Sequence, residues 1–383
     1  MQAIHSLLLV ILVLHVSGCN LTNKKPQGPI PSIPASVFNL NENINIETEQ
    51  QIFYLDSDTR KQISELVANT QTNKDKVSTI IHAIFDHSSL NLAYSIHANT
   101  VAQQTFNGRQ ANCLSLTILA FSMLEEIGIK ANFQEVLIPE FWTQRDGNTL
   151  INHHVNLKIV LNGTKYLPKK RAMTIDFNPQ QINKGLKTKV LNKKQIVSKF
   201  YANKGAEYLI KNNYDLAFLY LSNAVKTDPN NNSAWLNLGV VFARQDMLET
   251  AKEFYEYSIT LNPDFVSGYE NLALLLRKQG KHVLAEKQLA RLHRQRLSNP
   301  YYHLMLGDKD ALAKNFNQAI KHYKSALKIN HDMHQVYFSL AKAYFELDNI
   351  KSAKYSLRKA KNVSNDANLQ QVYSSKLNAL YSF

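Results

Sequence analysis

The chain has 383 residues, of which 44 are Lys or Arg and 30 are Asp or Glu, giving a formal net charge of +14. With 19% charged and 44% hydrophobic residues, the composition is that of a globular protein and excludes a wholly disordered chain. Only two cysteines occur, Cys19 and Cys113, which excludes both a disulfide framework and a multi-cysteine zinc site. The 12 glycines and 10 prolines are few for this length, which favours helices over a turn-rich β architecture.

An apolar segment lies near the N-terminus, where residues 7–16 read LLLVILVLHV. This segment is too short to span a bilayer, which takes about 20 apolar residues, but it matches the central part of a signal peptide. The VSGC sequence at 16–19 resembles the lipobox of bacterial lipoproteins, whose cysteine is acylated and begins the mature chain. The resemblance implies a lipoprotein signal peptide over 1–18 and a lipid on Cys19. Because Asn20 follows instead of Asp, it also implies an outer-membrane anchor that faces the periplasm.

The next segment, residues 19–50, is rich in Asn, Pro, Lys and Ser and shows no apolar periodicity. These features predict a flexible tether between the lipid and the first folded domain. The basic residues are scattered along the chain and no nucleic-acid-binding motif is present, so we predict no nucleic-acid partner. The predicted membrane contact is through the lipid anchor.

Residues 51–190 show a mixed pattern that predicts an α+β domain. Apolar residues at helical spacing predict helices near 57–70 and 74–86. A third helix is predicted over 113–127, and because it is apolar on nearly all sides we expect it to be buried at the centre of the domain. Three strands are predicted as well, at 131–138, 153–161 and 173–177. An Asn-Gly pair follows the second strand and is typical of a tight hairpin turn.

Cys113 begins the apolar helix and therefore lies beside the partial positive charge of a helix N-terminus, which favours the reactive thiolate. His154 opens a strand, and Asp176 lies on a later one. This order resembles the transglutaminase-like superfamily of papain-type cysteine enzymes. In particular, the sequences NCLS, FQEV, HVNL and IDFN resemble a bacterial subgroup that joins this core to tetratricopeptide repeats.

The resemblance implies a papain-like α+β core over about 95–180 in which Cys113 is the nucleophile, His154 the base and Asp176 the carboxylate that orients it. His153 is an alternative base. The alternation of apolar residues after the pair favours His154, whereas Asn156, three residues after His153, favours His153.

The spacing between the histidine and the aspartate also leaves two alternatives open. A hairpin with a two-residue loop at 162–163 would pair Arg171 with His154. If five residues around 167–171 loop out, Asp176 lies opposite His154 instead. Pro168 favours this excursion, because proline cannot donate a hydrogen bond to a strand ladder.

The implied chemistry is attack of the Cys113 thiolate on a carboxamide or peptide carbonyl, followed by hydrolysis or acyl transfer. His154 would move the proton, and the N–H of Cys113 would be one oxyanion donor. The second donor stays open, with Gln104 and Gln110 as candidates. No cofactor and no metal are predicted.

The C-terminal half repeats with a period of 34 residues from Ser198 to residue 367, which is the spacing of five tetratricopeptide (TPR) repeats. The eighth position of each repeat is small (Gly205, Gly239, Ala273, Gly307 and Ala341). So is the twentieth position (Ala217, Ala251, Ala285, Ala319 and Ala353). Small residues let the two helices of a repeat approach closely. Residues 368–383 are predicted to form a capping helix whose buried side carries Leu369, Val372, Leu377 and Leu380.

The predicted fold class is therefore multidomain, with a papain- or transglutaminase-like α+β domain followed by an all-α TPR solenoid. The solenoid predicts a groove that holds a protein or peptide, which would be the substrate of a membrane-anchored amide hydrolase or acyltransferase. The alternative is a non-catalytic scaffold lipoprotein, in which both domains only bind partners in the cell envelope.

Overall fold

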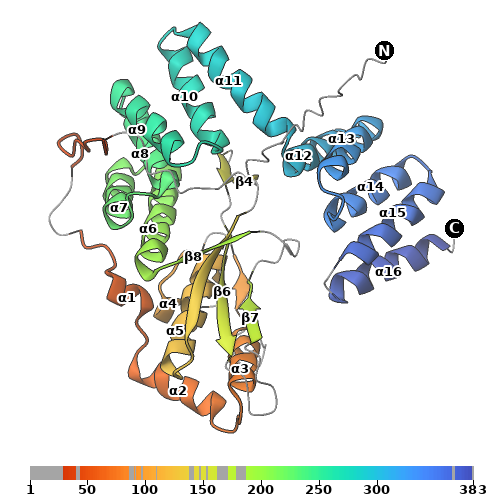
Figure 1. Cartoon of the computed structure of the whole chain (residues 1–383), viewed down its shortest axis with the longest axis horizontal. Helices are drawn as coiled ribbons and strands as arrows, with labels where there is room; N and C mark the ends of the chain where they lie inside the picture. The colour runs from red at the N-terminus through yellow and green to blue at the C-terminus, as the bar shows by residue number, and fades with distance from the viewer. Residues whose placement is uncertain are drawn as a thin grey trace, which may run out of the picture.

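The computed structural model describes residues 29–39, 44–85, 90, 92–95, 98–108, 110–137, 142–145, 148–151, 154–161, 171–177, 187–364 and 367–381. The predicted signal peptide with Cys19, the residue His153 and the segment 162–170 lie outside the described residues. Figure 1 shows an α+β domain that continues into a curved stack of paired helices.

The α+β domain surrounds one four-stranded antiparallel sheet in the order β7-β6-β3-β8. The strands of this sheet are β3 (Ala131–Val136), β6 (His154–Leu161), β7 (Arg171–Ile175) and β8 (Thr188–Leu191). Two short pairs accompany it. They are the parallel pair β1 (Ala93–Tyr94) and β2 (Gln110–Ala111), and the antiparallel pair β4 (Trp142–Arg145) and β5 (Asn148–Ile151). The helices of the domain are α1 (Glu49–Phe53), α2 (Ser57–Val67), α3 (Asn73–Phe85), α4 (Ala102–Asn107) and α5 (Cys113–Glu126).

Helix α5 is the central helix that the sequence predicts. Every residue from Leu114 to Leu124 is buried, so the helix is covered on all sides. Asn112 caps its N-terminus by accepting a hydrogen bond from the N–H of Ser115 at 2.8 Å. Gly128, with a φ of +74°, follows its C-terminus in the left-handed conformation that favours glycine. Strand β6 contacts α5 and alternates as expected, with Val155, Leu157 and Ile159 all buried.

The repeats follow the predicted register closely. The first helix of repeats two to five begins at residues 232, 266, 300 and 334, each 34 residues after the last. These helices are α8 (Asn232–Arg244), α10 (Val266–Lys278), α12 (Pro300–Leu312) and α14 (His334–Glu346). Their partners are α9 (Leu248–Leu261), α11 (His282–Leu297), α13 (Phe316–Ile329) and α15 (Ile350–Val363). The first repeat is formed by α6 (Lys193–Ile210) and α7 (Tyr214–Thr227), so its first helix starts five residues before Ser198.

The small residues of the repeats occupy the predicted close contacts. All five alanines at the twentieth position have an exposed fraction of 0%. A Cβ added to Gly239 would lie 2.5 Å from the ring of Tyr255, and one on Gly307 would lie 2.4 Å from the ring of Tyr323. No side chain fits at either position without displacing an aromatic ring, which explains the glycines there.

The first helices of the repeats form one layer of the stack and the second helices form the other. Among the first helices, α6 contacts α8, α8 contacts α10, and α12 contacts α14. The second helices lie outside them, with α7 and α9 on the outer left of the stack in Figure 1. The first helices therefore form the inner, concave layer that the solenoid prediction requires.

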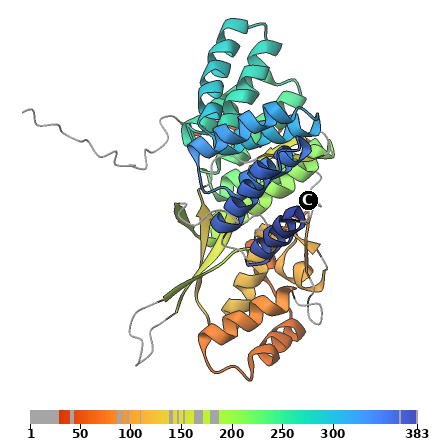
Figure 2. The ribbon, with the colours of Figure 1, turned by 90° about the vertical axis from the view of Figure 1, so that its right-hand side faces the viewer.

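The α+β domain and the first repeats share one hydrophobic core. It extends without interruption from Phe38 through α5 and the sheet to Ala285, and two smaller clusters fill repeats four and five with the last helix. In both Figure 1 and Figure 2 the orange helices α2 and α3 and the teal helices α10 and α11 lie at opposite ends of this continuous body, with α6 between them. The two domains are thus joined by packing as well as by the chain.

Described residues of the segment that is predicted to be a flexible tether contact the first repeat. Phe38 is 7% exposed, and its ring stacks on that of Phe218 in α7 with centroids 4.0 Å apart. Nearby, Glu47 accepts a hydrogen bond from the hydroxyl of Tyr220 at 2.8 Å. Burial and the Glu47 carboxylate raise the pKa of Tyr220, which keeps this hydroxyl a donor. A single aromatic residue in a polar segment gave no periodic signal, which is why the sequence did not reveal this contact.

The last helix, α16 (Ala367–Tyr381), packs on α15 as predicted, but its buried side differs by one residue. Val372 is 44% exposed, whereas its neighbour Tyr373 is 4% exposed. The hydroxyl of Tyr373 lies 2.8 Å from Nδ1 of His334 in α14, so a polar contact selects the face that is buried. Leu369 and Leu377 are partly buried against this cluster, and Leu380 is buried in it.

Candidate functional site

The first turn of α5 is held in place by its own polar residues. The N–H of Asn112 donates to the carbonyl of Ala98 at 2.9 Å, and the hydroxyl of Ser115 donates to the same carbonyl at 3.1 Å. Ser115 also accepts from the N–H of Thr100 at 2.8 Å. Cys113 is the first residue of the helix and is half-buried. Its backbone is therefore fixed at the positive end of a buried helix.

A single hydroxyl connects the turn of Cys113 to strand β6. The hydroxyl of Thr117, one turn further along α5, lies 2.7 Å from the carbonyl oxygen of Cys113 and 3.3 Å from that of Val155. Val155 directly follows His154 in the chain. The start of α5 and the start of β6 thus meet at one fully buried threonine, which brings the elements carrying Cys113 and His154 together.

The side chain of His154 is paired with Asp176. Both carboxylate oxygens of Asp176 lie 2.7 Å from Nε2 of His154. The histidine side chain is 4% exposed, whereas that of Asp176 is 39% exposed. An ionised carboxylate can only accept hydrogen bonds, so with Asp176 ionised this contact selects the imidazole tautomer with its proton on Nε2. Nδ1 is then the ring nitrogen left to accept a proton.

The strand register differs from both alternatives that the sequence left open. Leu157 pairs with Ile175 across β6 and β7. Continued by one residue, this register sets Asp176 opposite Asn156, two residues further along β6 than His154. The loop excursion is thus two residues longer than the predicted five. Asp176 nevertheless reaches His154 because His154 and Asn156 lie on the same side of their strand.

Asn156 is a member of the site that sequence reasoning treated only as a marker for the choice of histidine. Its side chain is 4% exposed, and its Nδ2 lies 3.4 Å from Asp176. Its Oδ1 is buried and accepts no hydrogen bond from the residues that the structure describes. The signal in the sequence is its place two residues after His154, on the polar side of a strand whose other side is apolar.

Both candidates for the second oxyanion donor are exposed residues near the start of α5 in the sequence. Gln104 is exposed on α4, and Gln110 is exposed on β2. Within the described residues, no group of three or more His, Cys, Asp or Glu side chains is arranged to hold a metal ion. We also find no helix in the described part of the chain that is long and apolar enough to cross a bilayer.

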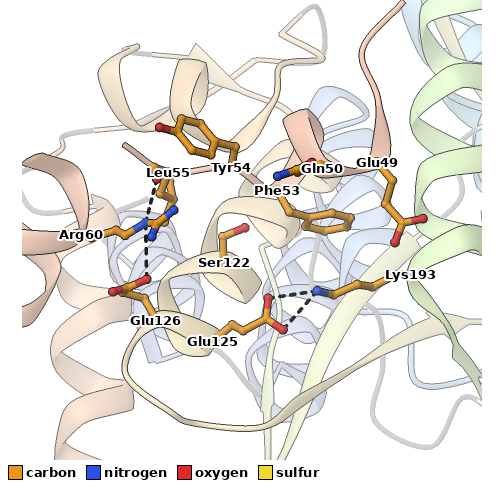
Figure 3. Close-up of a pocket in the computed structure, with 10 residues that line it drawn as sticks. All are labelled: Glu49, Gln50, Phe53, Tyr54, Leu55, Arg60, Ser122, Glu125, Glu126 and Lys193. Carbon is orange, nitrogen blue, oxygen red and sulfur yellow. Dashed lines mark hydrogen bonds and ion pairs between the residues drawn. The ribbon is translucent and has the colours of Figure 1, made fainter. Parts of the chain in front are cut away.

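A cavity of about 610 Å³ lies at the opposite end of α5 from Cys113. Two ion pairs line it, Arg60 with Glu126 at 3.7 Å and Lys193 with Glu125 at 3.0 Å, and Figure 3 shows Ser122 between them. Ser122 is nine residues from Cys113, which is about 13 Å along a helix. The cavity is therefore separate from the site at the N-terminus of α5.

Helix α6 connects the site to the repeats. Lys199, the second residue of the first repeat, forms a 2.6 Å ion pair with Glu135 on β3, and both side chains are at least four-fifths buried. The residue after Glu135, Val136, pairs with His154 across the sheet. On the other side of the site, the side chain of Asn99 donates to the backbone of Phe200 at 3.2 Å. The first repeat is thus in direct contact with the elements that position His154 and Cys113.

Comparison with known proteins identifies repeats in the C-terminal half. A model described as "TPR repeat" matches residues 299–348, and models described as "Tetratricopeptide repeat" match 204–264 and 334–366. The C-terminal half is therefore a tetratricopeptide repeat array, a module that binds proteins or peptides. These matches lie outside the α+β domain, whose resemblance to transglutaminase-like enzymes stays a prediction.

A curated relative is the protein O-mannosyl-transferase TMTC1 of Mus musculus, which is 34% identical over 98 residues. The match covers 26% of this chain and 10% of that protein, so the chain spans about a tenth of its relative's length. Among solved structures, a crystal structure of MamA covers 44% of this chain and 91% of its own at 20% identity, with a TM-score of 0.25. PilF of Pseudomonas aeruginosa covers 50% and 87% at 18% identity, with a TM-score of 0.28. YrrB, described as a TPR protein with an unusual peptide-binding site, covers 46% and 92% at 17% identity, with a TM-score of 0.25.

Proposed function

We propose that this chain binds a protein or peptide along the concave layer of its repeats and holds it beside the α+β domain. The main support for this function is the shared hydrophobic core, together with the ion pair between Lys199 and Glu135. These contacts fix the concave layer of the repeats relative to the α+β domain. The comparisons favour this binding function over a catalytic one, since the family models match only the repeats.

Exposed apolar side chains on the inner helices are the expected contacts for such a partner. Leu274 on α10 is 57% exposed and Leu312 on α12 is 88% exposed. Peptides that bind the full chain are first selected from a displayed library. We expect the double variant Leu274→Asp with Leu312→Asp to bind these peptides about tenfold more weakly, or worse, because a charge would enter an apolar contact. Affinity is measured by fluorescence anisotropy of the selected peptides.

The matched control for this test is Val283→Asp. Val283 is 84% exposed on α11, a second helix of its repeat, and therefore lies outside the concave layer. Unchanged affinity in the Leu274/Leu312 variant, or an equal loss in Val283→Asp, would show that the selected peptides do not bind the inner helices.

A second candidate function is cysteine-dependent acyl transfer at Cys113, which the contact between His154 and Asp176 favours. In this reaction Nδ1 of His154 takes the thiol proton, and the sulfur attacks a carboxamide or peptide carbonyl. The proton then passes to the leaving amine, which leaves a thioester on Cys113. Water or an amine attacks the thioester, and the chain is a hydrolase or an acyltransferase accordingly.

Three features support this chemistry. The N-terminal turn of α5 supplies backbone N–H groups and the positive end of a helix dipole, where negative charge develops on the carbonyl oxygen. Asp176 fixes the tautomer of His154. The contacts of Thr117 hold the start of α5, which carries Cys113, against the start of β6, which carries His154. The pH dependence of Cys113 alkylation tests this candidate directly.

We further propose that the chain is anchored to the bacterial envelope by a lipid on Cys19, on the basis of the lipobox-like sequence at 16–19. Replacing Cys19 by alanine is expected to release the protein from the membrane fraction after cell lysis, because no acyl chain can then be attached. Immunoblots of membrane and soluble fractions provide the measurement. An unchanged distribution would refute the anchor without affecting the binding function of the repeats.

A further inference from the structure

The outer helices of the last two repeats carry charge of one sign. The sequence of α13 contains three lysines and no acidic residue, and that of α15 contains five basic residues and no acidic residue. The equivalent outer helix of the second repeat, α9, contains three glutamates and one lysine. The outer helix of the third repeat, α11, is also basic but contains Glu286, so α13 and α15 differ from α9 and α11 in having no acidic residue.

The basic side chains follow the solvent side of each helix. Along α13 and α15 they recur at spacings of three and four residues, which place them on one helix face. The opposite faces are packed into the array, through Ala319 and Tyr323 in α13 and through Ala353 and Leu357 in α15. Both helices pack against α14. We define the basic surface by Lys321, Lys324 and Lys328 of α13 with Lys351, Lys354 and Arg358 of α15.

The basic surface carries more charge than the described residues pair with. Within the described residues, none of these six side chains forms a salt bridge, whereas Lys252 of α9 pairs with Glu256 at 3.7 Å. Five of the six are exposed. An uncompensated array of like charges destabilises the folded chain by self-repulsion, and an anionic partner removes that penalty.

Tyrosines with exposed rings lie among these charges. Tyr355 on α15 is 54% exposed, and Tyr381 at the end of α16 is 58% exposed. The ammonium group of Lys354 lies 4.6 Å from the centroid of the Tyr381 ring. Amphipathic rings beside lysines are typical of protein surfaces that contact the headgroup region of a membrane.

We propose that the basic surface binds the face of a bilayer that contains anionic phospholipids. Residues seven apart on a helix are about 10 Å apart, so the charges of each helix span more than one phosphate. Five of the six residues are lysines, which act as point charges, whereas arginine forks are preferred for bidentate recognition of individual phosphates. Spread point charges with flanking tyrosines favour a lipid surface over a nucleic acid. This binding is independent of the proposed lipid on Cys19 and of the reaction at Cys113.

The test is co-sedimentation of the full chain with vesicles of phosphatidylcholine alone or mixed with phosphatidylglycerol. The chain is expected to partition more strongly onto the mixed vesicles, and the difference should fall as salt shortens the Debye length from about 30 Å to about 3 Å. Each basic residue near an anionic membrane contributes about fivefold to partitioning. Lys321→Gln with Lys324→Gln and Lys328→Gln is therefore expected to lower the partition coefficient on mixed vesicles about 100-fold.

The control variant replaces Lys61, Lys74 and Lys76 by glutamine, which removes the same net charge from α2 and α3. Vesicles of phosphatidylcholine alone report any contribution of the apolar segment 7–16, which all variants share. A small effect of the control and a large effect of the α13 variant would support the proposal. Equal partitioning onto both vesicle types, equal losses in both variants, or tighter binding to a DNA duplex than to mixed vesicles at the same salt would overturn it.

Discussion

Replacing His154 by alanine is expected to slow alkylation of Cys113 by iodoacetamide about tenfold near pH 6. An ordinary thiol, with a pKa of about 8.5, is about 0.3% ionised at that pH, whereas a thiolate paired with imidazolium is largely ionised. The gain in thiolate is about 300-fold, but a thiolate of lower basicity is a weaker nucleophile by about 30-fold, and the two effects together leave about tenfold. The rate is followed by mass spectrometry of the peptide that contains Cys113.

The shape of the pH profile separates this role from a structural one. The unmodified chain should keep its rate down to about pH 6, whereas His154→Ala should lose about tenfold per pH unit below about pH 8. His82→Ala, which changes an exposed histidine on α3, is the matched control and should behave as the unmodified chain. If the alkylation rate of the unmodified chain falls below about pH 8 as that of an ordinary thiol does, the result would favour a non-catalytic α+β domain.

Replacing Phe38 by alanine is expected to lower the free energy of unfolding by about 3 kcal/mol. The ring of Phe38 stacks on Phe218 and meets that of Phe242 edge-on, with centroids 5.3 Å apart. Its loss would leave a cavity at the place where the N-terminal segment joins the first two repeats. Denaturant unfolding measures the free energy, and hydrogen exchange of residues 29–39 reports whether this segment detaches.

The neighbouring residue provides a control for this substitution. Val37 is 44% exposed, so Val37→Ala removes little buried surface and should change the free energy of unfolding by less than about 1 kcal/mol. Equal effects of the two substitutions would mean that the packing of Phe38 does not stabilise the array. In that case the N-terminal segment would be the flexible tether that its composition predicts.

Sequence periodicity predicted the repeats almost residue by residue because their constraint is local. Positions such as Gly239 and Ala251 must be small wherever two helices of a repeat touch, and the same requirement returns every 34 residues. The buried helix α5 was predictable for a similar reason, since its apolar residues cover all sides. In both cases the prediction rests on a pattern that extends over many residues, so it does not depend on any single contact.

The features that the sequence did not predict depend on single long-range contacts. The docking of Phe38 joins residues 180 positions apart and has no periodicity. The exact register of β7 against β6 depends on the length of the segment between them, which alternation alone does not determine. The burial of Tyr373 in place of Val372 depends on one hydroxyl–imidazole contact.

The candidate site was predictable from the sequence only in part. The residue types and their order pointed to Cys113, His154 and Asp176, and the structure places the carboxylate of Asp176 2.7 Å from the imidazole of His154. Asn156 was missed as a member of the site because an amide on an apolar strand has no chemistry of its own. The contact of its Nδ2 with Asp176 is apparent only once the position of Asp176 is known.

The contacts of α6 join the repeats to the α+β domain. A partner bound along the concave layer would lie on α6, whose Lys199 contacts the strand beside His154. In the catalytic candidate, the same rigidity would present an extended substrate to Cys113 in a fixed orientation, which is how binding energy lowers a barrier. In the scaffold alternative, it would hold a partner at a fixed place on the α+β domain.

The most direct test of a reactive unit formed by Cys113, His154 and Asp176 is a double-mutant cycle of Cys113 alkylation near pH 6. Asp176 contacts His154 and is expected to act only through it. The variant with both His154→Ala and Asp176→Asn should therefore react at the rate of His154→Ala alone. If the two substitutions instead multiply their separate losses, the residues act independently and the proposed unit is wrong.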